Sequence, residues 1–379
     1  MTGTAYATDA LTASAVKGSA KQSALPPDKP APHIALLLPL KSTVFGRAAE
    51  AVRQGFLAAA GNQQKVLPVK VYECADEGTD IIALYQQAIA GGARAVAGPL
   101  TRNGVIALAA YPAITAPTLA LNFGESKSSD KLYFFSLTAD MEARQIAQMA
   151  ASAGLSKANI VNNGTPLSKR LAQAFAEEWK MQGGQVVKEI LYREDSNVLS
   201  DLPATEGSMV FLAADAESAH LIRPFINYSL PVYSTSQVFA GNTSPLINFD
   251  LNDVRFIDMP WLLQPDHPAV MVYPRANPPP DADMERLFAL GIDAFRLLQV
   301  MLDNNYRSAL PMDGVTGRIR LNSRRQFLRE AIPAQFWHGR GLTPEAVATE
   351  EAALAAAKAA AAASSVVPAP SGSPSVPAQ

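Results

Sequence analysis

The chain has 379 residues, enough for two domains or for one two-lobed fold with a large core. Its 32 Lys and Arg residues nearly balance its 34 Asp and Glu residues, so the net charge of -2 argues against the basic surface of a nucleic-acid-binding protein. No run of 18 apolar residues occurs, so we expect no transmembrane helix, and the single cysteine, Cys74, cannot form an internal disulfide.

The two ends differ in composition from the rest of the chain. Residues 1–31, rich in Ala, Ser and Pro, are predicted to be a disordered linker. Residues 341–379 are predicted to be an Ala/Pro-rich tail in which 352–363 favours a short helix. The first 31 residues contain neither the apolar stretch of a signal peptide nor a cysteine for a lipid. The chain as given is therefore expected to be cytoplasmic, or to be the mature or truncated form of an exported protein.

Between these ends, strands and helices alternate. His33–Leu38 is a continuous apolar run, as expected for a strand that is buried on both faces. Apolar residues from Phe45 to Phe56 then recur every three or four positions, which indicates a helix that ends at Gly61. The alternation continues, with strands predicted at 69–72, 95–97, 118–121 and 132–137. This order indicates βαβ units and a parallel sheet.

The pattern restarts after residue 139. Strands are predicted at 160–161, 186–191, 209–213 and 232–234, with helices between them. The last part contains a strand at 254–258, a long amphipathic helix at 284–302 and a turn at 314–317. We therefore predict an α/β fold of two lobes, each a parallel sheet flanked by helices. The first lobe is predicted to contain residues 32–138 and 262–312, and the second lobe residues 139–261 and 313–340.

Sequence motifs for catalysis are nearly absent. The chain has no phosphate-binding loop, no dinucleotide-binding glycine motif, no zinc-protease motif and no serine-hydrolase elbow. Ser128–Lys131 matches the S-x-x-K nucleophile pattern, but no K-T-G follows, so a hydrolase that uses Ser128 is a remote alternative. Histidines occur only singly, at His33, His220, His267 and His338. We predict no catalytic residue, no cofactor and no metal site.

Small polar residues follow the predicted strands, at the edge where open parallel sheets bind ligands. They suit hydrogen bonding in a cleft, but their preference for helix N-caps explains the same residue types. A solute receptor for an amino acid or amide is therefore an alternative, with Lys41 and Arg102 as the cations near this edge. The cleft candidates are Ser42, Thr43, Gly98, Leu100, Thr101, Asn122, Ser136, Asn163, Ser234 and Ser236.

Two aromatic residues are candidates for a partner surface. Trp261 lies in the segment Met259–Leu263, which follows a strand near the point where the chain should cross between the lobes. Phe239 lies in the segment Ser236–Gly241. Exposed aromatic side chains concentrate binding energy at protein interfaces, whereas buried ones would hold the lobes together. Both interpretations remain open for both residues at this point.

Several segments resemble known proteins. The opening IALLLPLKSTVFGRAAEAVRQGF and the two successive α/β lobes resemble the type I periplasmic-binding-protein fold over about 33–340. More specific segments resemble the LppC-type lipoprotein family, the penicillin-binding protein activators. These segments are SQVFAG at 236–241, LNDVRFIDMPWLL at 251–263, ALGIDAFRL at 289–297 and GVTG at 314–317.

The resemblance implies a function that composition alone does not show. It implies a non-enzymatic periplasmic protein, tethered to the outer membrane, that binds a bifunctional (class A) penicillin-binding protein and stimulates peptidoglycan synthesis. Longer members of the family carry an N-terminal helical-repeat domain, and the present chain has no room for one. The lipid anchor of the family would belong to a precursor, because Cys74 follows a strand and cannot serve as the anchor.

Overall fold

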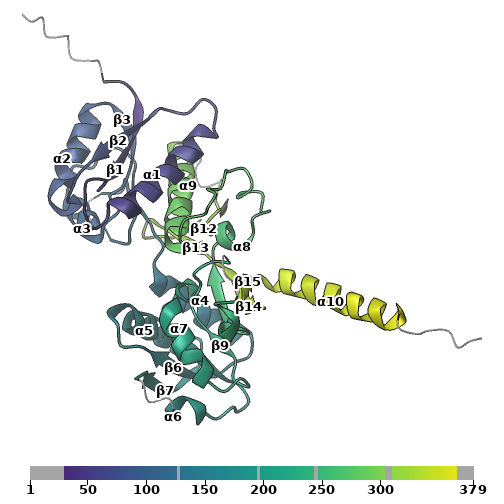
Figure 1. Ribbon diagram of the computed structural model, residues 1–379. Coiled ribbons are helices and arrows are strands. Elements are labelled where there is room, and N and C mark those ends of the chain that lie inside the picture. Colours follow the sequence, from purple (N-terminus) through teal and green to yellow (C-terminus); the bar gives the residue numbers. More distant parts are fainter. Residues whose placement is uncertain (1–29, 126–128, 194–196, 243–245, 304–309, 365–379) are drawn as a thin grey trace, which may run out of the picture.

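A computed structural model describes residues 30–125, 129–193, 197–242, 246–303 and 310–364. These residues form two lobes, each built around one sheet (Figure 1). The predicted linker is described only at residues 30 and 31, and Ser128 of the S-x-x-K match lies outside the described residues. None of the helices described in the structure combines the length and apolarity that a membrane crossing needs.

The first sheet has eight strands in the order β11-β12-β13-β5-β4-β3-β1-β2. Strands β1 to β5 are all parallel to their neighbours, and β11 to β13 add an antiparallel extension at one edge. The strands are β1 (His33–Leu38), β2 (Val69–Glu73), β3 (Ala93–Ala97), β4 (Thr118–Ala120), β5 (Leu132–Phe135), β11 (Met312–Gly314), β12 (Gly317–Leu321) and β13 (Gln326–Glu330).

Helices cover both faces of the first sheet, as βαβ connections require. The helices are α1 (Gly46–Gly61), α2 (Glu77–Ala90), α3 (Arg102–Ala110), α8 (Pro260–Leu263) and α9 (Ala282–Leu302). Every residue of β1 is buried, and the buried stripe of α1 includes Val52 and Phe56, as its apolar periodicity predicts. Helices α1 and α9 pack side by side on one face of this sheet (Figure 1), and α2 and α3 pack together in a second core.

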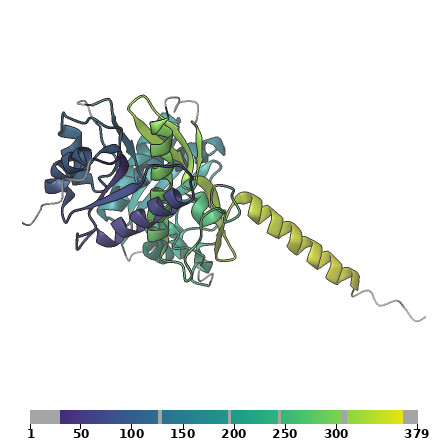
Figure 2. The ribbon, with the colours of Figure 1, turned by 90° about the horizontal axis from the view of Figure 1, so that it is seen from above.

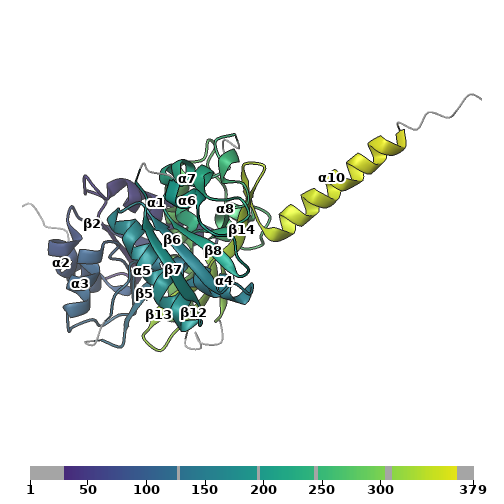
Figure 3. The ribbon, with the colours of Figure 1, turned by 90° about the horizontal axis from the view of Figure 1, so that it is seen from below.

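The second sheet has seven strands in the order β15-β14-β10-β9-β8-β6-β7. The strands are β6 (Lys157–Asn162), β7 (Gln185–Leu191), β8 (Ser208–Ala213), β9 (Val232–Tyr233), β10 (Arg255–Asp258), β14 (Ile332–Trp337) and β15 (Arg340–Leu342). Its helices are α4 (Ala139–Ser152), α5 (Pro166–Met181), α6 (Asn197–Ser200) and α7 (Ala216–Ile222), with the short 3-10 helices η1 (Arg223–Phe225), η2 (Ser236–Val238) and η3 (Phe249–Leu251). Seen from below, this lobe lies in front of the first (Figure 3).

The predicted division of the chain between the lobes is wrong for part of residues 313–340. Strand β13 pairs in parallel with β5, with Gln326 opposite Phe134, so β12 and β13 extend the first sheet. Only β14 and β15 join the second sheet. Trp261, placed by the prediction at the end of the second lobe, packs in the core of the first. These assignments depend on pairings between distant segments, which local sequence patterns do not contain.

The predicted C-terminal tail begins with folded structure. Residues 340–342 form β15, and α10 runs over Pro344–Ser364, starting well before the short helix predicted at 352–363. Val347 is buried near the start of α10, whereas residues 351–361 are exposed. Seen from above, α10 therefore projects away from both lobes (Figure 2).

Candidate functional site

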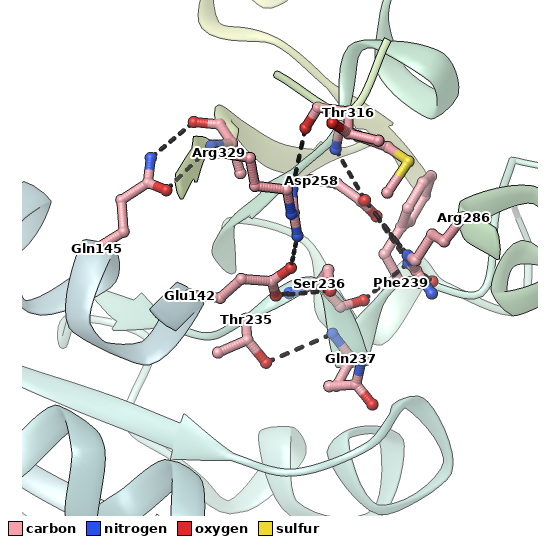
Figure 4. Close-up of polar contacts among 12 residues, drawn as sticks. Glu142, Gln145, Thr235, Ser236, Gln237, Phe239, Asp258, Arg286, Thr316 and Arg329 are labelled. Atoms are coloured by element: carbon pink, nitrogen blue, oxygen red, sulfur yellow. Dashed lines mark hydrogen bonds and ion pairs between the residues drawn. The ribbon is translucent and has the colours of Figure 1, made fainter. Parts of the chain in front are cut away.

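The chain crosses between the two sheets three times. The crossings lie between β5 and α4, between β10 and α8, and between β13 and β14. We call the polar residues at these crossings the lobe junction (Figure 4). The junction contains buried ion pairs and hydrogen bonds that connect the lobes.

Glu142, in the first turn of α4, connects three parts of the junction. Its Oε2 atom accepts hydrogen bonds from the backbone N–H of Ser236 at 3.0 Å and from the Ser236 hydroxyl at 2.6 Å. Its other carboxylate oxygen pairs with the guanidinium of Arg329 on β13. Both charged side chains are almost completely buried. Glu142 therefore connects the second lobe to β13 of the first sheet.

Arg286 of α9 makes a second connection between the lobes. Its Nη2 atom lies 2.7 Å from Oδ2 of Asp258 on β10, and it also donates to the carbonyl oxygens of Ser236 and Phe239 at 2.9 and 2.7 Å. Burial alone would lower the pKa of the Arg286 guanidinium, but the Asp258 carboxylate raises that pKa above its ordinary value. The guanidinium therefore stays charged and its donors are used within the junction.

Asp293 lies two helical turns after Arg286 on the buried side of α9. Its carboxylate accepts hydrogen bonds from the backbone N–H groups of Val315 and Thr316 at 3.1 and 2.7 Å, and from the Thr316 hydroxyl at 2.7 Å. It also pairs with Arg296 at 2.9 Å. Burial raises the pKa of Asp293, and these contacts oppose the rise. The carboxylate thus anchors the 314–317 turn to α9.

The four segments that resemble the LppC family meet at these contacts. Ser236 and Phe239 from SQVFAG accept from Arg286, which also pairs with Asp258 from LNDVRFIDMPWLL. ALGIDAFRL contributes Asp293, which binds the GVTG turn. These segments, far apart in the chain, therefore encode one structure, the lobe junction.

The junction does not have the arrangement of an active site. Its carboxylates are paired with arginines or with backbone N–H groups, and no nucleophile lies beside a free base among the contacts described. In the described part of the chain, no group of three or more His, Cys, Asp or Glu side chains could hold a metal ion. These buried contacts connect the two lobes, and the loss of one partner of a buried ion pair costs about 3–5 kcal/mol.

Four cleft candidates of the first lobe lie around a buried carboxylate, that of Glu77. Glu77 accepts hydrogen bonds from the backbone N–H groups of Leu100 and Thr101, which follow Gly98. Asn122 donates to the Leu100 carbonyl at 3.0 Å. Burial raises the pKa of the Glu77 carboxyl. Most polar groups in this cluster are therefore used internally.

Several candidates act as helix caps or as contacts within one lobe. Ser42 accepts from the N–H of Phe45 at the start of α1, and the Thr101 hydroxyl caps α3, while Thr43 is exposed. Ser42 and Thr101 also line one groove of about 250 Å³. In the second lobe, Asn163 donates to Ser218, and Ser234 donates to the Leu212 carbonyl. The candidates thus divide between the two lobes, and Ser236 belongs to the junction.

A groove does run between the lobes. Arg102 and Asn122 from the first lobe and Asp140 and Arg170 from the second line a volume of about 350 Å³. Ser136 lies close to this groove, lining a smaller cavity with Thr138 and Glu142. The Ser136 hydroxyl is buried and has no hydrogen-bond partner among the described residues. Binding of a small ligand in this groove remains a prediction.

The two aromatic candidates for a partner surface are buried, so the prediction that they form an exposed surface is wrong. Trp261 is 1% exposed, and its Nε1 atom donates to Glu285 at 2.6 Å. The Arg275 guanidinium lies 4.3 Å from its ring, beside a pocket of about 500 Å³ between α1 and α9. Phe239 is 2% exposed and packs on Phe256. Both therefore hold the structure together.

The sequence analysis missed the charged residues of the junction. A signal for two of them exists in α9, where Arg286 and Asp293 lie seven positions apart on the side that Leu290 and Leu297 bury. Charges on the apolar side of a helix indicate buried pairs, since an unpaired buried charge is costly. Glu142 has no such signal, because its partners lie 94 and 187 positions away.

Comparison with known proteins identifies the family. The family model described as "LppC putative lipoprotein" matches residues 27–205 and 203–339. The chain belongs to the LppC family. Its two-lobed fold of parallel-dominated sheets, predicted from the sequence, is also confirmed by solved relatives.

Curated relatives of this LppC chain include a "Penicillin-binding protein activator LpoA" from Glaesserella parasuis. It is 26% identical over 298 residues, which cover 75% of this chain and 50% of that protein. The chain spans about half the length of the curated relatives it matches. The match therefore concerns one part of those longer proteins.

Two solved structures resemble most of the LppC chain. A Chromobacterium violaceum structure described as "a putative branched-chain amino acid ABC transporter" is 36% identical, with a TM-score of 0.70, and the match covers 80% of this chain and 99% of that one. The C-domain of Haemophilus influenzae LpoA, described as "a regulator of PBP1A", is 23% identical with a TM-score of 0.67, covering 82% and 99%. The second likeness shows the fold alone.

Proposed function

We propose that this chain is a non-enzymatic activator of peptidoglycan synthesis that binds and stimulates a bifunctional (class A) penicillin-binding protein. The observation that carries the proposal is the match of its lobes to the LppC family, whose curated relatives are named penicillin-binding protein activators. The junction supports it, because the buried pairs Glu142–Arg329 and Arg286–Asp258 connect the two lobes and favour one relative orientation. A rigid body can present a constant surface to a partner at little entropic cost.

A reconstituted synthesis assay tests this function. The purified chain is added to a purified bifunctional penicillin-binding protein and its lipid-linked substrate, and cross-linked peptides are measured over time. We expect a faster rate of cross-linking with the chain and no product from the chain alone. Heat-denatured chain is the control. The absence of both binding and a rate change would refute the activator function.

The same proposal includes the location of the protein. The family is described as a lipoprotein family, which supports the periplasm and a lipid tether to the outer membrane in the precursor. Labelling of cells with a radioactive fatty acid, followed by fractionation of the envelope, tests the tether. Recovery of the unlabelled native protein in the cytoplasm would refute the location.

A second candidate function is a receptor for an amino acid or amide. It is favoured by the Chromobacterium violaceum structure and by the unpartnered Ser136 hydroxyl beside the groove between the lobes. A ligand that binds only the folded state at 100 times its Kd adds about 2.7 kcal/mol of stability. A thermal-shift screen of amino acids and amides would therefore detect it. A screen without any shift would count against this function.

A further inference from the structure

The second lobe has a cluster of exposed large apolar side chains that no part of the lobe junction uses. We call it the apolar patch. Such side chains normally turn inward, and several together on a surface mark an interaction site. The patch consists of Leu221 on α7, Phe225 on η1, Tyr228 in the following turn, and Leu246, Ile247 and Phe249 at or beside η3.

The elements that carry these side chains lie together in the second lobe. Helix α7 and the 3-10 helices η1 and η3 contact one another. The Nδ1 atom of His220 on α7 lies 2.8 Å from Oδ1 of Asp250 on η3. Leu221 follows His220 and Phe249 precedes Asp250, so both residues are sequence neighbours of this contact. The patch is therefore built on fixed elements.

The side chain of Tyr228 packs against the buried side chain of Arg223. The Arg223 guanidinium, 1% exposed, lies 4.0 Å from the centre of the Tyr228 ring. One guanidinium N–H donates to the Ile226 carbonyl at 3.0 Å, while Nε has no hydrogen-bond partner in the described residues. An aromatic side chain that is ordered before binding loses little entropy on binding, so Tyr228 has the properties of an interface anchor.

The charges around the patch indicate what it binds. Between residues 197 and 254 the sequence contains six carboxylates and one Lys or Arg, the buried Arg223, and the exposed Arg255 follows directly at the start of β10. Glu217 is exposed one helical turn before Leu221, and Asp253 is exposed beyond η3. The border of the patch is thus acidic, and complementarity requires a basic border on the partner.

The acidic border of the patch disfavours two other binding partners, a second copy of this chain and an anionic membrane. In a twofold dimer of this chain the patch would face itself, and its acidic border would face a second acidic border. Membranes with anionic headgroups attract basic segments and would repel this border. A protein surface whose apolar side chains are bordered by Lys and Arg is complementary to both the apolar side chains of the patch and its acidic border.

We propose that the apolar patch is the docking surface for the enzyme that the chain activates, and that the enzyme meets it with apolar side chains bordered by lysine and arginine. The proposal rests on the proposed function, because the partner is the same. It adds the place of contact, which neither the family match nor the junction indicates. The patch does not include Trp261 or Phe239, the aromatic residues first considered.

Binding measurements with matched variants test the patch. Full-length chain is passed over an immobilised bifunctional penicillin-binding protein. The double substitution Leu221→Ser and Phe249→Ser is expected to weaken binding about tenfold or more. Ile106→Ser on α3 is the matched control, because Ile106 is 59% exposed and Leu221 is 61% exposed. Ile106→Ser should bind like the unmodified chain.

A charge variant tests the same proposal without removing apolar contacts. Glu217→Lys changes an exposed side chain, so it should fold normally even if the double variant does not. It is expected to slow association with the enzyme several-fold at low salt, with a smaller effect at high salt. Unchanged association at low salt would overturn the acidic border as a docking element.

The outcomes separate the patch from the proposed function. If the unmodified chain binds the enzyme and the folded patch variants bind equally well, the patch is refuted and the activator function stands. If the unmodified chain does not bind, both are refuted. Sedimentation and vesicle binding are measured in parallel. The proposal would be overturned if the double variant abolished a dimer, or a complex with anionic vesicles, and left enzyme binding unchanged. The patch would then be the binding site for that other partner.

Discussion

Arg286 of α9 and Asp258 of β10 form an ion pair across the lobe junction, with the two charged atoms 2.7 Å apart and both side chains buried. Asp258 comes from the second sheet and Arg286 from the helix that packs on the first, so this pair joins two separate cores. The guanidinium also satisfies the carbonyl oxygens of Ser236 and Phe239. One side chain therefore serves three segments of the chain.

We expect Arg286→Met to destabilise the protein strongly. Methionine keeps much of the volume but leaves the Asp258 carboxylate and two carbonyl oxygens buried without their donor. Removing one partner of a buried pair costs about 3–5 kcal/mol, which urea unfolding would measure. Arg47→Met is the matched control, because the Arg47–Asp281 pair is largely exposed and should contribute little. Equal midpoints for the two variants would contradict this account.

The close packing of α1 and α9 gives a second prediction. A Cβ atom at Gly291 would lie 2.1 Å from the Val52 carbonyl oxygen, so the two helix backbones touch there. Gly291→Ala must push the helices apart, and overpacking of this kind typically costs about 1–3 kcal/mol. Gly61→Ala, at the end of α1, is the control because a Cβ there meets nothing within 4 Å. A loss of stability in the control as large as in Gly291→Ala would contradict the packing argument.

Local patterns explain why the elements of the first sheet could be predicted. The strand His33–Leu38 and the helix after it depend on residues a few positions apart, and both form as expected. The assignment of β13 could not be predicted in this way, because Gln326 pairs with Phe134, far earlier in the chain. Strand pairing of this kind is decided by the packed cores and not by periodicity.

The candidate site was predictable to a smaller extent. Small polar residues at strand ends were predicted to form hydrogen bonds in a cleft, but Ser234 and Asn163 use their bonds within one lobe. An exposed Trp261 was one of two predicted alternatives, and it is wrong. The residues next to Trp261 in the sequence do not show that Glu285 accepts a hydrogen bond from its indole N–H. The resemblance of separate segments to one family was more informative, since those segments meet at the junction.

Cys74 gives a prediction about chemical reactivity. Burial, with a further contribution from the charge of Glu77, raises the pKa of the thiol from its ordinary 9.0 to about 12. Since each pH unit changes the thiolate fraction about tenfold, native Cys74 should carry roughly a thousandfold less thiolate at pH 8 than a free thiol. Alkylation with iodoacetamide should therefore be very slow in the native protein and fast in guanidinium. Equal rates in both conditions would refute the burial of this thiol.

The titration of Asp293 gives the last prediction. Burial raises the pKa of this carboxyl in the folded protein above its ordinary 3.8, so above about pH 3.8 the folded state holds more protons at Asp293 than the unfolded state. The stability that Asp293 contributes is thus present at low pH and is lost as the pH rises through the folded pKa. Asp293→Asn cannot titrate. The free energy of unfolding of the variant, minus that of the unmodified protein, should therefore increase between pH 4 and pH 8.

Urea unfolding of both proteins across this pH range measures that difference, and all other titrating groups cancel in it. At low pH the Asp293 carboxyl is protonated in both states, so the substitution removes no charge and the difference between the two proteins should have its lowest value there. Thr316→Val is the control, because it removes one hydrogen bond to Asp293 and leaves the carboxylate in place. The lost hydrogen bond favours the charged form of Asp293, so its loss raises the pKa of Asp293 in the folded state further. The Thr316→Val variant should therefore lose more stability than the unmodified protein as the pH rises. A difference for Asp293→Asn that decreases with pH would show that the contacts outweigh burial at Asp293.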